Sequence, residues 1–185
     1  MRSEDLGRRY RIGPLGRTGA RDGFRCGVDA LDRYLRQQAS QDVRRRVTSV
    51  WTAVDKTSGA IHGYYSLAMA GVPLTLLPAD LSARMPRYPS VPAIRLGRLA
   101  VSVEARGQGL GTFLLLDSMH RALGNEVAWA AFIVDAKDDG ARGFYARFGF
   151  VSLADDPRHL FLPRGTIEAV FRPASAKGRG SGERG

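Results

Sequence analysis

The chain has 185 residues, 44% of them hydrophobic, which is enough for one domain with a substantial core. It contains no apolar run long enough to span a bilayer, no secretion-signal pattern and a single cysteine. These features exclude a membrane-spanning protein and an internal disulfide, and they favour the cytoplasm. We expect one domain over residues 1–172 and a disordered basic tail over residues 173–185.

The net charge of +10 is concentrated near the N-terminus, where residues 1–46 hold twelve arginines against six acidic residues. A basic surface of this kind suits a polyanion such as nucleic acid, although a solvated basic face explains the charge equally well. The candidate contacts lie largely off the apolar stripe of a predicted helix: Arg33, Arg36, Arg44, Arg45 and Arg46.

The N-terminal third predicts one strand and one helix. Residues 1–22 have weak periodicity, and we expect an early strand from them. Residues 28–47 predict a helix because their apolar residues recur with helical spacing, at Val28, Leu31, Leu35, Ala39 and Val43.

The middle of the chain predicts a hairpin and a long connection. Residues 50–54 and 61–68 have the pattern of two strands joined by a turn. Residues 73–92 are polar and rich in proline, which predicts a connection with one short helix near residue 81.

The second half alternates strands and helices, which indicates a mixed sheet covered by helices. Strands are expected at residues 95–101 and 127–134, and helices at 112–123 and 140–148. Two closing strands are expected at residues 150–153 and 167–171.

The most informative segment is residues 96–115, where an apolar strand pattern passes through a glycine-rich turn into a helix. The first N–H groups of a helix have no intrahelical partner and carry partial positive charge, so they suit an anion. Gly109 and Gly111 lack Cβ, which lets a pyrophosphate approach the backbone. The segment predicts a diphosphate cradle, and the alternative is a tight turn with no ligand.

The identity of the diphosphate follows from the spacing. A P-loop needs a Lys–Ser/Thr pair that is missing here, and a dinucleotide fingerprint starting at Gly107 would need glycine at Thr112. Arg106, Gly109 and Gly111 instead fill the pattern Arg/Gln-x-x-Gly-x-Gly/Ala, which resembles the acetyl-coenzyme A motif of the GNAT acyltransferases.

This resemblance implies the GNAT fold, an α/β fold with a central mixed sheet flanked by helices. In that fold the fourth and fifth strands, here residues 95–101 and 127–134, splay apart around the cosubstrate acetyl-CoA. The residues that the resemblance places at acetyl-CoA are Leu99, Ala100, Val101, Arg106, Gly107, Gln108, Gly109, Leu110, Gly111, Thr112, Asp138 and Phe144. Many members of the family have an asparagine after the fifth strand, and here Asp138 and Asp139 stand near that position instead.

The predicted helix at residues 140–148 carries an aromatic face made by Ala141, Phe144, Tyr145 and Phe148, and Gly149 is placed for a left-handed C-cap. The pattern Phe-Tyr-x-x-x-Gly-Phe resembles the last helix of GNAT enzymes, where a tyrosine faces the thioester sulfur. The resemblance implies that Tyr145 is the catalytic acid, whereas the alternative is a packed core tyrosine.

Further segments resemble one branch of the GNAT enzymes, the acetyltransferase toxins of type II toxin–antitoxin modules. They begin at Phe24, Gly63, Pro86, Leu96 and Asp135, and together they span roughly residues 20–171. The resemblance implies acetylation of the α-amino group of aminoacyl-tRNA, a block of translation, a ribbon-helix-helix antitoxin as partner and a homodimer. Arg98 then becomes a further candidate for tRNA contact, or it pairs with an acidic neighbour.

Two other functions stay open at this point. A GNAT enzyme could acetylate a small amine or a protein N-terminus, and a basic nucleic-acid-binding module could keep the fold without catalysis. We expect Cys26 to be a small buried core residue rather than a nucleophile. The three histidines lie on separate elements without ligand spacing, so we expect no metal site.

Overall fold

The computed structural model describes residues 3–16, 21–83 and 87–172, and within them the strands form one sheet in the order β1-β2-β3-β4-β5-β7-β6. β4 and β5 are parallel and every other neighbouring pair is antiparallel. The strands are β1 (Tyr10–Pro14), β2 (Ser49–Asp55), β3 (Ile61–Pro73), β4 (Ser90–Val101), β5 (Ala131–Asp135), β6 (Val151–Ser152) and β7 (His159–Pro163).

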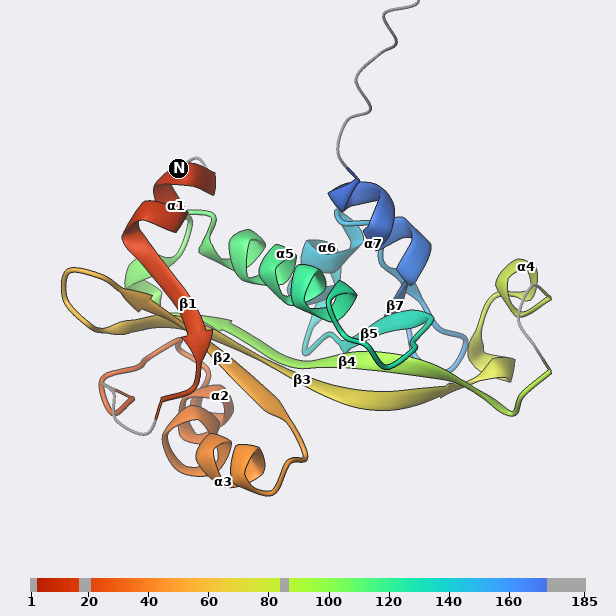
Figure 1. Ribbon diagram of the computed structural model, residues 1–185, viewed down its shortest axis with the longest axis horizontal. Helices are drawn as coiled ribbons and strands as arrows, with labels where there is room; N and C mark the ends of the chain where they lie inside the picture. The colour runs from red at the N-terminus through yellow and green to blue at the C-terminus, as the bar shows by residue number, and fades with distance from the viewer. Residues whose placement is uncertain (1–2, 17–20, 84–86, 173–185) are drawn as a thin grey trace, which may run out of the picture.

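Helices cover both faces of this sheet (Figure 1). α5, α6 and α7 lie on one face, and the α2–α3 segment lies on the other. No helix in the described ranges is long and apolar enough to cross a membrane. The helices are α1 (Ser3–Arg9), α2 (Asp29–Arg33), α3 (Ala39–Arg44), α4 (Ala79–Ser82), α5 (Leu110–Leu123), α6 (Asp139–Ala146) and α7 (Arg164–Phe171).

The first half follows the predictions, except that β3 runs on to Pro73 and β4 begins at Ser90, so the connection expected at residues 73–92 is shorter. The expected early strand is β1, and it is preceded by α1, which the weak periodicity did not predict. The expected helix at residues 28–47 is α2 and α3 joined by a π-helical turn at Tyr34–Gln38. Leu35 and Ala39 on its apolar stripe are fully buried. α4 is the short helix expected near residue 81.

The end of the chain corrects two predictions. Residues 164–171 form α7 rather than a closing strand, because Ile167 and Phe171, four residues apart, share a helical face that packs on the core around α5. The missing strand is β7, which pairs with both β5 and β6.

β5 is shorter than the strand expected at residues 127–134. It begins only at Ala131, because the indole of Trp129 donates to the carbonyl of Ala122 and Val127 is exposed. The tail expected at residues 173–185 lies outside the described residues.

β4 and β5 separate as the GNAT resemblance implied. They pair only from Ala93 to Leu96, and β4 then continues to Val101 without β5 beside it. A register shift between Ser66 and Leu67 of β3 lies opposite this point, and such irregularities bend a strand and increase its twist. The sheet therefore opens between Gly97 and the end of β5.

The close contact between β3 and α5 gives a test of the packing. A Cβ on Gly63 would lie 2.7 Å from Leu114 and 3.1 Å from the carbonyl oxygen of Ala100. Gly63→Ala should therefore lower the free energy of unfolding by about 1–3 kcal/mol, as overpacking does. Gly13→Ala in β1, where nothing lies within 4 Å of the added Cβ, should not. Urea denaturation of both variants checks this, and equal stabilities would contradict the packing described.

Candidate active site

The predicted cradle has the expected geometry. β4 leads through a short 3₁₀ turn at Val103–Ala105 to Gly107 and Gly109, which have φ of +71° and +85°. α5 begins at Leu110, directly after Gly109 and two residues earlier than expected, and no side chain caps it. Its first N–H groups therefore remain available for an anion.

The aromatic helix α6 lies against the cradle. A Cβ added to Gly111 would be 3.9 Å from the ring of Phe144 and 3.7 Å from Val101. Ala141, Phe144, Tyr145 and Phe148 all pack on the core cluster around α5, as predicted, although α6 ends at Ala146 and Phe148 lies in the turn that follows. Gly149 has φ of +86°, the left-handed conformation expected of it.

Tyr145 is buried, with 6% of its surface exposed, and its ring packs edge-on against Phe144 and Phe150. Burial alone raises the pKa of its hydroxyl above the ordinary value, so the phenol is neutral and keeps its proton at physiological pH. Within the described residues, no hydrogen bond of this hydroxyl is found. A neutral phenol of this kind is a proton donor for a group that enters the site.

A cavity of about 220 Å³ occupies the opening between β4 and β5. Tyr145 lines it together with Leu96, Gly97, Arg98 and Leu99 of β4. The start of α2, the end of β5 and the start of α6 complete the wall, at Val28, Ala30, Leu31, Val134, Asp135, Lys137 and Ala141. The predicted catalytic tyrosine therefore faces the separation of the two strands.

A second cavity, of about 320 Å³, adjoins the first and shares Ala30, Leu31 and Arg98 with it. The guanidinium of Arg98 lies 3.5 Å from the ring centre of Tyr34, a cation–π contact. Arg33 lines the same cavity. Two of the arginines predicted for tRNA thus line one cavity, and Arg98 also lines the cavity at Tyr145.

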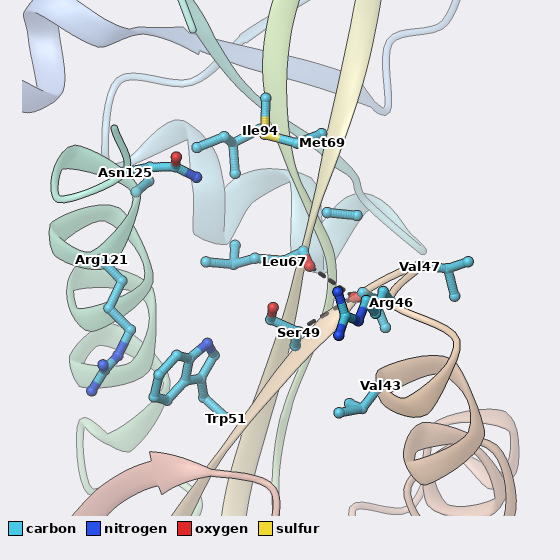
Figure 2. Close-up of a pocket in the computed structure, with 13 residues that line it drawn as sticks. Val43, Arg46, Val47, Ser49, Trp51, Leu67, Met69, Ile94, Arg121 and Asn125 are labelled. Carbon is cyan, nitrogen blue, oxygen red and sulfur yellow. Dashed lines mark hydrogen bonds between the residues drawn. The ribbon is translucent and has the colours of Figure 1, made fainter. Parts of the chain in front are cut away.

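The remaining candidate arginines lie elsewhere on the α2–α3 segment. Arg44, Arg45 and Arg46 are exposed at its end, and Arg36 is half-buried. Arg46 lines a groove of about 550 Å³ with Trp51, Leu67 and Met69 (Figure 2). This groove lies between the end of α3 and the end of α5, and it shares no residue with the cavity at Tyr145 or with the second cavity beside that one. The six arginines therefore do not form a single cluster.

Two predicted cosubstrate residues make local contacts. The guanidinium of Arg106 donates to the carbonyl of Cys26, so it ties the cradle loop to the segment before α2. Asp138 caps α6 by accepting from the N–H of Ala141 at 2.7 Å, and Lys137 pairs with it. These two partners lower the pKa of the Asp138 carboxyl, which therefore stays ionised.

Cys26 is buried, as expected of a small core residue, and burial raises the pKa of its thiol to about 11. His62 lies 4.0 Å from Glu104, and His159 contacts Asp135 and Asp155. Among the described residues, no group of three or more histidines, cysteines and carboxylates is placed to hold a metal.

Sequence reasoning missed the contribution of Tyr34 to the site. Its position on the buried side of the helix identifies it as a core residue, but the stack with Arg98 joins two segments 64 residues apart and leaves no local signal. Tyr34 is itself stacked on Tyr64 of β3, which fixes the plane on which Arg98 rests.

Comparison with known proteins agrees with this geometry. Residues 83–159 match the model of the acetyltransferase (GNAT) domain. A tRNA-acetylating toxin of Mycobacterium tuberculosis is 36% identical over 142 residues, which cover 75% of this chain and 82% of the relative.

Solved structures agree as well. AtaT complexed with acetyl-methionyl-tRNAfMet superposes with a TM-score of 0.81 at 26% identity, over 88% of this chain and 99% of AtaT. The structure of AtaTR bound with AcCoA superposes with a TM-score of 0.77 at 25% identity, over 89% of this chain and 99% of that structure's chain. An AtaT mutant toxin bound to the C-terminus of the antitoxin AtaR superposes with a TM-score of 0.75 at 24% identity, over 89% of this chain and 99% of the toxin. This match supports the fold alone.

The open sheet, the glycine turn before α5 and the tyrosine helix agree with what the GNAT resemblance implied, and the Mycobacterium tuberculosis relative is 36% identical over three quarters of the chain. The chain belongs to the GNAT acetyltransferases, in the family of the tRNA-acetylating toxin.

Proposed function

We propose that this protein is a toxin that transfers the acetyl group of acetyl-CoA to the α-amino group of aminoacyl-tRNA and so blocks translation. The observation that carries the proposal is the position of Tyr145 in the opening between β4 and β5, next to the cradle at the start of α5. The relative named a tRNA-acetylating toxin supports the substrate, and the AcCoA-bound neighbour supports the cosubstrate.

The cradle fits the diphosphate of acetyl-CoA. The N–H groups of Leu110, Gly111 and Thr112 are the first of α5 and can donate to its oxygens. Phe144 packs over Gly111, and Leu99, Ala100 and Val101 line the open part of β4 beside it. Arg106, Gly107, Gln108 and Gly109 form the turn, and Asp138 can only accept hydrogen bonds because it is ionised.

Acetyl-CoA supplies a thioester whose sulfur leaves as a thiolate and needs a proton. Tyr145 keeps its proton because burial raises the pKa of its hydroxyl, and it has no competing partner among the described residues. It can therefore donate to the leaving sulfur. Backbone N–H groups of β4 beyond Leu96, which have no β5 partner, are candidates to hold the acetyl carbonyl.

The α-amino group suits a site without a strong base. Its ordinary pKa is about 7.7, against about 10.4 for a lysine side chain, so a substantial fraction is neutral at cellular pH. His62 is a buried imidazole near the cradle loop. Its carboxylate neighbour Glu104 is largely exposed, so the two do not form a buried His–carboxylate pair of the kind that makes a strong base. A neutral acceptor needs only orientation in the cavity beside Tyr145.

Arg33 and Arg98 line the second cavity, which adjoins the cavity at Tyr145, and there they can contact phosphates of the tRNA acceptor end. Arg36, Arg44, Arg45 and Arg46 extend the positive charge along the α2–α3 segment. Electrostatic contacts of this kind position an RNA backbone without reading its sequence.

The partners follow from the same assignment. We propose an antitoxin with a ribbon-helix-helix domain as partner, as the resemblance to the toxins of type II toxin–antitoxin modules implies. We also propose a homodimer, one catalytic domain over residues 1–172, and a cytoplasmic location, where charged tRNA is found.

Tyr145→Phe tests the acid. The variant removes one hydroxyl and keeps the ring that packs on Phe144 and Phe150, so the fold should survive. Transfer of acetyl to charged tRNA should fall by about 10²–10⁴-fold while acetyl-CoA affinity holds. Tyr88→Phe is the matched control, because Tyr88 is exposed, and it should behave as wild type. Near-wild-type transfer by Tyr145→Phe would make Tyr145 a core residue only.

The arginines are tested separately from the chemistry. Replacing Arg44, Arg45 and Arg46 with Gln should weaken tRNA binding and reduce its logarithmic salt slope by up to about three. Acetyl-CoA affinity should stay constant. A control variant with three other exposed arginines changed to Gln, at Arg147, Arg158 and Arg172, removes the same charge. Equal salt slopes in both variants would mean that the arginines at the end of α3 form an ordinary solvated surface and do not contact tRNA specifically.

A further inference from the structure

The guanidinium of Arg9 joins two distant parts of the chain at the cradle. Its Nε donates to Oδ2 of Asp55 at 3.0 Å, and its Nη1 donates to Oε1 of Gln108 at 2.9 Å. Arg9 ends α1, which lies beside the loop that leads into α5 (Figure 1). The cradle loop is therefore linked through Arg9 to the end of β2.

Gln108 is held at both ends of its amide. Its Nε2 donates to the carbonyl of Glu104 at 2.9 Å, while its Oε1 accepts from Arg9. It stands between Gly107 and Gly109, both in the left-handed conformation. A glycine backbone loses more conformational freedom on ordering than any other, so the clamped side chain of Gln108 restrains the part of the loop that would otherwise move most.

The other end of this link is rigid. The Asp55 side chain is 8% exposed and also accepts from the N–H groups of Thr57 and Ser58, at 2.9 and 3.0 Å. Together with Arg9, these donors lower the pKa of the Asp55 carboxyl, so it stays ionised. α1 is itself anchored, because Leu6 is 3% exposed in the core cluster that includes Leu110.

We propose that Arg9 is a positioning residue for acetyl-CoA: acting through Gln108, it holds the glycine cradle in its binding conformation before the diphosphate arrives. The proposal rests on the cradle being the acetyl-CoA site. Preorganisation lowers the entropy that binding must remove, so Arg9 should affect cosubstrate affinity rather than the chemical step. Nothing in the acetyl-CoA motif itself includes Arg9, which lies 97 residues before Arg106.

Titration calorimetry with acetyl-CoA, together with steady-state kinetics, tests the proposal on the full chain. Arg9→Met should raise the Kd and the KM for acetyl-CoA about fivefold, the size of one lost hydrogen bond, with kcat unchanged at saturation. Gln108→Ala should do the same. Arg8→Met, which removes an exposed arginine of the same helix, should bind as wild type.

The double variant of Arg9 and Gln108 separates positioning from other roles. If Arg9 acts through Gln108, the double variant should bind no more weakly than Gln108→Ala alone. Additive losses would mean that Arg9 contacts the phosphates directly, and would overturn the proposal. A lower melting temperature with unchanged Kd would make Arg9 purely structural, and would overturn it too.

A final variant keeps this proposal apart from the cradle assignment. Gly109→Glu should abolish acetyl-CoA binding if the cradle is the site, because a carboxylate there repels the pyrophosphate. Unchanged binding by Gly109→Glu would remove the cradle assignment itself, whereas loss in Gly109→Glu with wild-type binding by Arg9→Met would remove only the role of Arg9.

Discussion

The separation of β4 from β5 after Leu96 is the constraint on which the rest of the site depends. Two parallel strands that stay paired leave no space between them, whereas here the ladder stops after four residue pairs while β4 runs on to Val101. The cavity beside Tyr145 occupies the space that results. The irregular pairing of β3 with β4 at Ser66 and Leu67 lies at the same level and allows β4 to turn away.

The two chemical parts of the site are placed by elements on one face of this opening. α5 follows β4 directly and presents its uncapped N-terminus, and α6 follows β5 and presents Tyr145. The contact between Phe144 and Gly111 fixes the two helices against each other. The opposite face carries the α2–α3 segment, whose Tyr34 supports Arg98 at the mouth of the neighbouring cavity. Cosubstrate and acceptor can thus approach one opening from different sides.

The features that could be predicted from sequence are those determined by residues close together in the chain. The turn before α5 needs glycines at fixed positions and the aromatic face of α6 needs a spacing of three and four residues, so both of these local structures were predicted correctly. Residues 167–171 were expected as a strand and form part of α7, and β7 was not predicted at all, because short apolar segments fit either structure until their packing partners are known.

The features that could not be predicted from sequence depend on contacts between distant parts of the chain. Arg106 matches the motif, yet its guanidinium binds the Cys26 carbonyl 80 residues away. The stack of Arg98 on Tyr34 and the link from Arg9 to Gln108 also join distant segments. Charge alone was ambiguous as well, because the arginines of the α2–α3 segment are dispersed: Arg33 lines the cavity that it shares with Arg98, whereas Arg44 and Arg46 line two other pockets.

The identity of the acceptor is the central claim, and one measurement tests it most directly. The protein is incubated with labelled acetyl-CoA and either charged or deacylated tRNA, and mass spectrometry locates the acetyl group. We expect acetyl on the α-amino group of the aminoacyl ester and none on deacylated tRNA, which lacks that amine. Equal labelling of deacylated tRNA, or labelling of small amines alone, would contradict the account.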